Sequence, residues 1–215
     1  MFYQIFVIAI LIFLFVWFLK ATNKQGYTLS SLINAYRFAL RESFAKFSKS
    51  DKSNKSTFLI KLKVFLFYFI ILQYVTMAFT GFVPIIIGTH MTGLALIIHV
   101  TLASLFSISI ALGLLLSAYD NSFTNEEFEH LYKRYFTKDK LSDSQSTSYI
   151  KKLYFWLTAI FAIPAILSII LALYPIFSLE GSKILIDIHR YSVVFMTISF
   201  IIHIFYSLNS INNKN

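Results

Sequence analysis

The sequence contains no cysteine and few acidic residues. The lack of cysteine excludes disulfides, iron–sulfur clusters held by thiolates, and covalently attached c-type haem in this chain. Only 10 of the 215 residues are Asp or Glu, against 19 Lys and Arg, and the net charge is +9. Any metal or redox group must therefore be held by other ligands, and the five histidines are the main supply.

The sequence is rich in apolar residues. They make up 57% of the chain, and 18% of the residues are aromatic. A membrane span needs about 20 apolar residues, and five stretches qualify: 2–19, 62–81, 84 or 91 to 119, 153–174 and 185–208. The sequence therefore predicts an all-α integral membrane protein with five transmembrane helices and no separate globular domain.

The basic residues alternate between the two sides of these spans. Ten Lys or Arg lie between the first and second spans, none between the second and third, and six between the third and fourth. The fourth connection has only Lys183, with Arg190 just inside the last helix. By the positive-inside rule the N-terminus lies outside and the C-terminus in the cytoplasm. The basic excess thus reflects orientation in lipid, and we expect no nucleic-acid partner.

The pattern predicts four segments. Residues 1–20 form a membrane anchor, which we expect to be retained because it lacks a positive start and a small-residue cleavage site. Residues 21–61 form a basic cytoplasmic loop, in which 26–49 has the periodicity of an interfacial amphipathic helix. Docking of a peripheral subunit and binding to anionic headgroups both remain open for this helix. Residues 62–208 form a four-helix membrane domain, with a cytoplasmic loop at 120–152, and 209–215 form a polar tail.

Two histidines lie fourteen residues apart in the last span. At about 100° per residue, His189 and His203 share one face of the helix, about 21 Å apart along its axis. Between them Ser192, Met196 and Ser199 recur at helical spacing, with small residues at two of the three steps. Ionisable residues at membrane depth are costly and tend to mark ion paths, proton relays or cofactors, so this face is a candidate site.

The third span carries two more histidines, His90 and His99. The third and fifth spans run in the same direction, so residues near the same end can ligate one haem iron from opposite sides of the ring. His90 would then pair with His189 toward the outside, and His99 with His203 deeper in. Along the helix axis, His90 and His99 would lie about 13 Å apart, whereas His189 and His203 would lie about 21 Å apart. A third helix that begins near Pro84 would leave each pair offset by only a few ångströms.

Three other interpretations compete with haem. Copper or zinc would need ligands within a few ångströms of one centre, whereas the two histidines of the last span are far apart. A proton relay would normally include buried carboxylates, and no span contains one in its interior. Histidines that only hydrogen-bond to backbone or to neighbouring helices are the simplest alternative, and His99 is the most open to it.

The last span also resembles that of a known family. The segment IHRYSVVFMTISFIIHIFYSL, 188–208, resembles the last helix of di-haem b-type membrane cytochromes such as the cytochrome b subunits of respiratory formate dehydrogenases. In that family two histidines fourteen apart ligate two different haems. The segments MAFTGF, 77–82, and HMTGLALII, 90–98, are similar to the end of the family's first helix and to the histidine that opens its next helix. The resemblance covers roughly residues 64–208.

The resemblance implies particular haem ligands. His90 and His189 would hold one haem b, and His203 would be one ligand of a second. The family's remaining ligand falls at about Phe67, which cannot bind iron, and His99 is the intramembrane histidine left to replace it. The resemblance therefore implies two haems, or one if His99 does not ligate.

The resemblance implies electron transfer between the quinone pool and a partner redox subunit. The partner would carry iron–sulfur clusters or multiple c-type haems, and the complex would lie in a bacterial cytoplasmic (inner) membrane. Residues 62–208 would be the haem-binding domain of one subunit in a quinone-linked oxidoreductase. Arg190 would pair with a haem propionate, or would anchor the helix at the membrane boundary. The alternative function is a non-haem membrane scaffold or transporter subunit of a larger complex.

Overall fold

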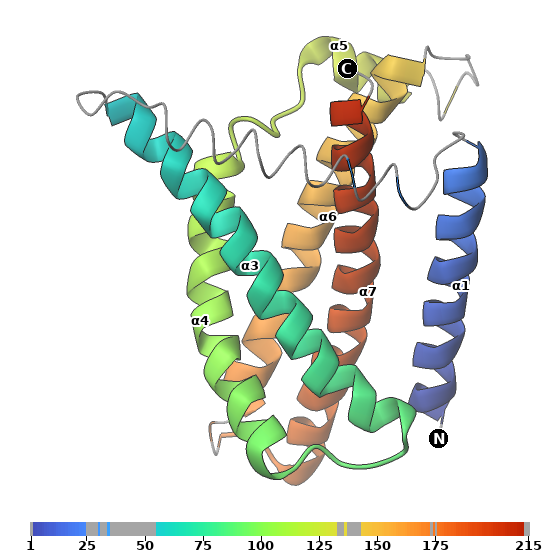
Figure 1. Cartoon of the computed structure of the whole chain (residues 1–215). Coiled ribbons are helices and arrows are strands. Elements are labelled where there is room, and N and C mark those ends of the chain that lie inside the picture. Colours follow the sequence, from blue (N-terminus) through green and yellow to red (C-terminus); the bar gives the residue numbers. More distant parts are fainter. Residues whose placement is uncertain are drawn as a thin grey trace. The chain divides into compact units, whose positions relative to one another are not determined.

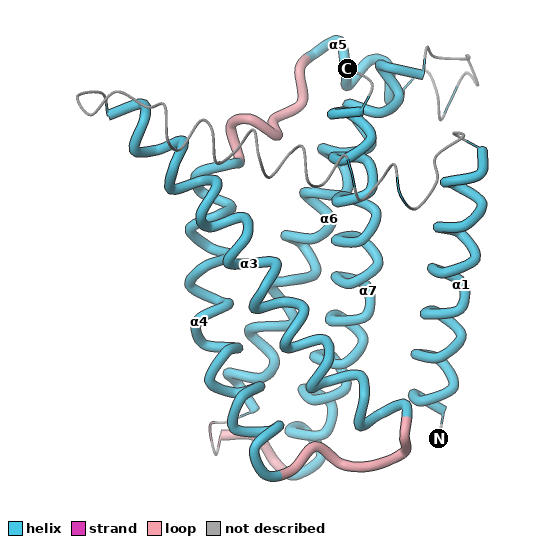
Figure 2. The backbone as a smooth tube through the Cα atoms, in the orientation of Figure 1, coloured by secondary structure: helices cyan, strands magenta, loops and turns pink. Residues whose placement is uncertain are grey.

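The computed structural model describes residues 2–24, 30, 34, 55–132, 136, 143–172, 174 and 176–212. Over these residues it contains six helices and no strand (Figures 1 and 2). The helices are α1 (Phe2–Lys24), α3 (Lys55–Ile86), α4 (Gly93–Ser117), α5 (Asn125–Tyr132), α6 (Asp143–Ala172) and α7 (Leu179–Asn212). The predicted all-α fold is confirmed.

Five of these helices, all but α5, are long and apolar enough to cross a membrane. The spans are Phe2–Asn23, Phe58–Ile86, Gly93–Ser117, Tyr149–Ala172 and Leu179–Ser207. They overlap the five predicted stretches one for one, and the helices extend them because flanking polar residues continue the helical backbone. The structure thus supports a multi-pass membrane protein whose helices contact lipid. The sidedness of the termini stays a prediction.

The end of α3 differs from the prediction. The sequence ends the second span at Gly81 and allows a third that begins at Pro84 or Met91, but α3 continues through Gly81 and Pro84 to Ile86. The helix stops at Gly88, whose φ of 74° suits glycine alone. There the N–H of Gly88 donates to the carbonyl of Ile85 and the N–H of Thr89 to that of Pro84. The expectation of a helix starting at Pro84 was therefore wrong, and α4 begins at Gly93.

The chain divides into two compact units, Met1–Tyr119 and Asp120–Asn215. In the first unit α3 and α4 pack as an antiparallel pair. The rings of Tyr74 and Phe106 lie 6.1 Å apart, and a Cβ on Gly113 would lie 2.8 Å from Cδ1 of Ile70. The small residue at 113 thus lets the two helices approach closely.

In the second unit α6 and α7 lie side by side and antiparallel (Figure 1). The rings of Phe161 on α6 and Phe195 on α7 stack at 5.3 Å with 25° between their planes. Pro164 lies inside α6 and removes one backbone N–H from it. Helices in membranes tolerate this where neighbours cover the freed carbonyl group.

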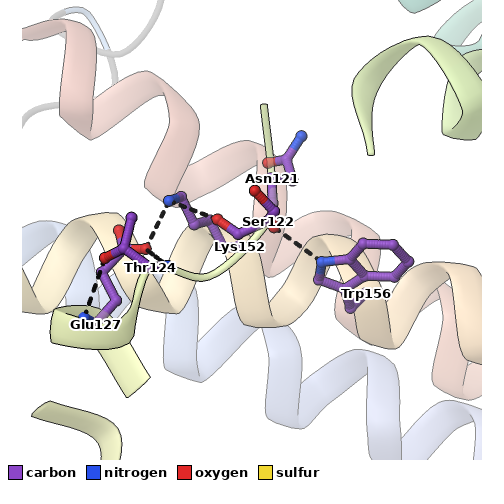
Figure 3. A network of polar contacts seen from close by, with 6 residues as sticks. All are labelled: Asn121, Ser122, Thr124, Glu127, Lys152 and Trp156. Atoms are coloured by element: carbon purple, nitrogen blue, oxygen red, sulfur yellow. Dashed lines mark hydrogen bonds and ion pairs between the residues drawn. The ribbon is translucent and has the colours of Figure 1, made fainter. Parts of the chain in front are cut away.

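A polar network joins the start of α5 to α6 (Figure 3). Thr124 and Glu127 form a capping box: the N–H of Thr124 donates to Oε2 of Glu127, and the N–H of Glu127 donates to Oγ1 of Thr124. Nζ of Lys152 lies 2.6 Å from the same Oε2 and also donates to the carbonyl of Ser122. Trp156 Nε1 donates to the carbonyl of Asn121 nearby. These bonds fix the connection 121–127 against the first turns of the fourth span.

Two predictions fall mainly outside the described residues. The interfacial amphipathic helix at 26–49 does so apart from Ser30 and Asn34. The polar tail at 209–215 is described only as far as Asn212, where α7 ends. The predicted four-helix domain, 62–208, includes parts of both compact units, and its division from the anchor stays a prediction.

Candidate histidine sites

His189 is anchored to the backbone of the neighbouring helix. Its Nδ1 lies 2.7 Å from the carbonyl oxygen of Ala165 on α6, and the side chain is half-buried. A carbonyl oxygen only accepts, so Nδ1 must carry the hydrogen and donate it. In the neutral ring this leaves the lone pair on Nε2. Among the residues that the structure describes, Nε2 of His189 makes no hydrogen bond.

His203 repeats the arrangement at the other end of the span. Its Nδ1 lies 2.9 Å from the carbonyl oxygen of Lys151, again on α6. The ring lies 5.8 Å from that of Phe155 and is tilted 52° to it. The same reasoning assigns the hydrogen to Nδ1 and the lone pair to Nε2.

The two histidine bonds have matching spacing. His189 and His203 are fourteen residues apart on α7, and their acceptors, Ala165 and Lys151, are fourteen apart on α6 in the opposite order. Each interval is about 21 Å of helix. The helices therefore stay in register over this length, and both rings are held in the same way by the same neighbour.

His99 belongs to the first unit and bonds to a hydroxyl. Its Nδ1 lies 2.9 Å from Oγ1 of Thr80 on α3. That hydroxyl is within 3.0 and 3.1 Å of the carbonyl oxygens of Thr76 and Met77, to which it donates. Nδ1 of His99 donates to this hydroxyl in one tautomer of the ring and accepts from it in the other. For His189 and His203, whose partners are carbonyl oxygens, the bond fixes the hydrogen on Nδ1.

Gly81 makes room for the His99 ring. A Cβ at position 81 would lie 3.3 Å from Cε1 of His99, tighter than ordinary contact. In the sequence this glycine marks only the end of the predicted second span, and nothing singles out Thr80. The spacing between Thr80 and His99 carries no sequence signal, because the contact depends on how α3 packs against α4.

His90 lies in the loop between α3 and α4 and is exposed. Gly88 and Gly93 flank this loop with φ values of 74° and 57°. His90 precedes α4, so helix periodicity does not relate its direction to that of His99. The backbone turn between two glycines, rather than a helix face, sets its direction.

The four histidines divide equally between the units. His90 and His99 lie in the first, and His189 and His203 in the second. Each predicted haem pair joins a histidine of one unit to a histidine of the other, so both pairings stay predictions. The structure instead pairs each of three histidines, His99, His189 and His203, with a hydrogen-bond partner in its own unit.

Arg190 already has a carboxylate partner. Its Nη1 lies 3.2 Å from Oδ1 of Asp187, one turn earlier on α7, and both side chains are exposed. An exposed ion pair of this kind contributes little to stability, about 0–1 kcal/mol. The propionate and boundary roles of Arg190 stay predictions.

Taken one at a time, the side chains of His189 and His203 are suited to be axial ligands of haem iron. Ligating histidines typically donate their second ring N–H to a carbonyl or carboxylate, which fixes the tautomer and the ring. His189 and His203 have this arrangement through Nδ1. Within the described ranges no three His, Asp or Glu side chains gather as a metal group, and iron held by two histidines does not require one.

Comparisons with protein-family models, with curated proteins and with solved structures found no match for this chain. The family resemblance therefore rests on the histidine spacing and the helix patterns described above.

Proposed function

We propose that the chain is the b-type cytochrome subunit of a quinone-linked respiratory complex in a bacterial inner membrane, with its N-terminus outside. His90 with His189, and His99 with His203, would hold up to two haems. Partner subunits that carry iron–sulfur clusters or c-type haems would exchange electrons with it, as the chain has no cysteine for such centres.

One observation supports this proposal most. His189 and His203, fourteen residues apart, both donate Nδ1–H to backbone carbonyls of α6, and in the neutral ring Nε2 carries the lone pair. This is the protonation state that an axial ligand needs. Bound haem would supply one-electron transfer at this depth in the membrane. The chain itself holds the two imidazole rings and fixes their tautomer.

The test is a pyridine haemochrome measurement on the purified full-length protein, expressed with its haem supply intact. We expect one or two haems b per chain and the reduced-minus-oxidised spectrum of low-spin bis-histidine iron. Protein that folds in detergent but contains no haem would contradict the proposal.

The substitution His189→Asn separates ligation from packing. The Asn Nδ2 can replace Nδ1 of His189 as donor to the Ala165 carbonyl, but it provides no counterpart to Nε2. We expect loss of one haem with little loss of stability. Ser199→Ala, on the same helix face, is the control. Its hydroxyl donates to the carbonyl of Phe195 within α7, and we expect its haem content to be unchanged.

A second function is favoured by the same bonds. Because His189 and His203 tie α7 to α6 at two levels, their role could be purely structural in a scaffold or transporter subunit of a membrane complex. This alternative predicts no visible absorbance in the wild type. It also predicts that His→Asn variants stay assembled with normal stability.

A further inference from the structure

A groove of about 450 Å³ runs between α6 and α7, beside the bond of His189 to Ala165. Its size falls in the range of small-molecule sites. Most of its surface is apolar and it is open along one side, where Ile184, Ile188 and Phe195 are exposed. These residues belong to a helix long and apolar enough to span a membrane, so we expect the open side to face an apolar medium. The lining residues are Phe161, Pro164, Ile184, Asp187, Ile188, Tyr191, Ser192 and Phe195.

Ser192 supplies a buried donor to this groove. The residue is only 8% exposed, yet it makes no hydrogen bond among the described residues. By contrast, the hydroxyls of Thr197 and Ser199 on the same helix donate to carbonyls one turn back. The Ser192 hydroxyl is accessible from the groove, and a hydroxyl without a partner costs free energy in an apolar medium. A ligand in the groove would satisfy it.

Pro164, which lines the groove, leaves one carbonyl of α6 without its usual partner. Because proline has no N–H, the carbonyl of Ile160 lacks its usual partner within α6. The contacts of Ala165 with His189 and of Phe161 with Phe195 set the helix register, which places the turn 160–164 level with 190–194. The Ile160 carbonyl and the Ser192 hydroxyl therefore lie at about the same depth.

Aromatic and charged groups complete the site. The stacked rings of Phe161 and Phe195 form an apolar wall on which a flat ring can pack. Asp187 and Tyr191 bring polar groups to the groove, and Asp187 is paired with Arg190. A ligand must then be lipid-soluble, flat and equipped with oxygen atoms that accept or donate one hydrogen bond. Acyl chains of phospholipids offer no such oxygen at this depth.

We propose that this groove binds the ring of a membrane quinone or quinol. Ser192 donates to a quinone carbonyl oxygen, the Ile160 carbonyl accepts from a quinol hydroxyl, and the prenyl tail leaves through the open side. Ser192 lies one helical turn from His189, so the ring is held close to a proposed haem ligand. The inference locates the quinone site and rests on the proposed function.

Photoaffinity labelling tests the site directly. The probe is an azido-substituted short-chain quinone, added to the full-length protein in phospholipid nanodiscs, with the labelled peptides mapped by mass spectrometry. We expect label within 160–164 and 184–195 that is competed by the unsubstituted quinone. Label spread evenly over all the apolar helices, without competition, would overturn the proposal.

Two variants sharpen the result. Ser192→Ala removes the donor, and Pro164→Ala restores an N–H that occupies the Ile160 carbonyl. Ser192→Ala should weaken competition by the quinone about fivefold, and Pro164→Ala should weaken competition by the quinol about fivefold, the effect of one hydrogen bond. The control Ser199→Ala should weaken neither. Equal affinity in Ser192→Ala, Pro164→Ala and Ser199→Ala would also refute the site.

The labelling does not depend on haem, so the two proposals fail separately. Haem in the purified protein without competed label in the groove would leave the cytochrome proposal standing and refute the quinone site. Competed label in protein without haem would support the binding groove and refute the cytochrome function.

Discussion

The Nδ1 atom of His203 lies 2.9 Å from the carbonyl oxygen of Lys151, at the end of α6 that also holds α5. The next residue, Lys152, pairs with Glu127 at 2.6 Å, and both side chains are largely buried, at 13% and 19% exposed. Lys151 and Lys152, on one turn of α6, thus link His203 to the segment 121–127 that joins the third and fourth spans.

The first prediction concerns the ion pair. Lys152→Met should destabilise the protein by about 1–3 kcal/mol, because Glu127 loses the charged partner that compensates its burial. The start of α6 should loosen with it and shift the absorbance of any haem held by His203. Thermal unfolding in detergent measures the first effect and difference spectra the second. Lys183→Met, an exposed lysine near the start of α7, is the matched control; a loss as large in the control would argue against the ion pair.

The second prediction separates two functions of His203. His203→Ala removes both the donor to Lys151 and the possible ligand, whereas His203→Asn keeps a donor at the position of Nδ1. We expect the Asn variant to be more stable than the Ala variant by about 1 kcal/mol, measured by denaturant unfolding. Both should lack the haem of this site. Identical stability of the two variants would show that the bond to the backbone contributes nothing.

The third prediction concerns Gln73 on α3. Its side chain is 2% exposed, and neither its amide nitrogen nor its amide oxygen has a hydrogen-bond partner among the described residues. Replacing an unsatisfied buried amide by an apolar group of similar size should stabilise the protein, so Gln73→Leu should raise unfolding free energy by about 1–3 kcal/mol. Gln4→Leu, which loses a bond to the Ile86 carbonyl, should not stabilise. A less stable Gln73→Leu variant would mean that the amide binds a group beyond the described residues.

The fourth prediction uses two glycines on facing helices. Gly81→Ala places a methyl group 3.3 Å from Cε1 of His99, so the ring must move and its bond to Thr80 must weaken. We expect a loss of about 1–3 kcal/mol and an altered spectrum if His99 ligates haem. Gly113→Ala meets only the terminal methyl of Ile70, which can rotate away. Thermal unfolding of the two variants should therefore differ, with the larger effect at Gly81.

The sequence predicts the spans well and the contacts poorly, for a physical reason. Apolar length is a local property, so five spanning helices follow from composition alone. Whether Gly81 or Gly88 ends α3 depends on which residue adopts a positive φ, and Gly88 does. Thr80 is bound by a histidine nineteen residues away, and the acceptors of His189 and His203 are backbone carbonyls, which have no side-chain signature.

The groove illustrates the same limit. Ser192 was visible in the sequence only as a small residue on the histidine face. Its lack of a partner and its position level with the turn before Pro164 depend on the register of α6 and α7. Neither could be read from residue spacing in one helix. Helix periodicity locates candidate faces, and packing decides which groups on them are available for chemistry.

The short link between α6 and α7 bears on how the protein is made. α6 ends at Ala172 and α7 begins at Leu179, so six residues separate them. During synthesis, the carbonyl acceptors at 151 and 165 enter the membrane before the histidines that bond to them. The same order holds in the first unit, where Thr80 precedes His99. Each newly inserted helix therefore finds its hydrogen-bond partner already in place, and its histidine need not cross the bilayer interior unpaired.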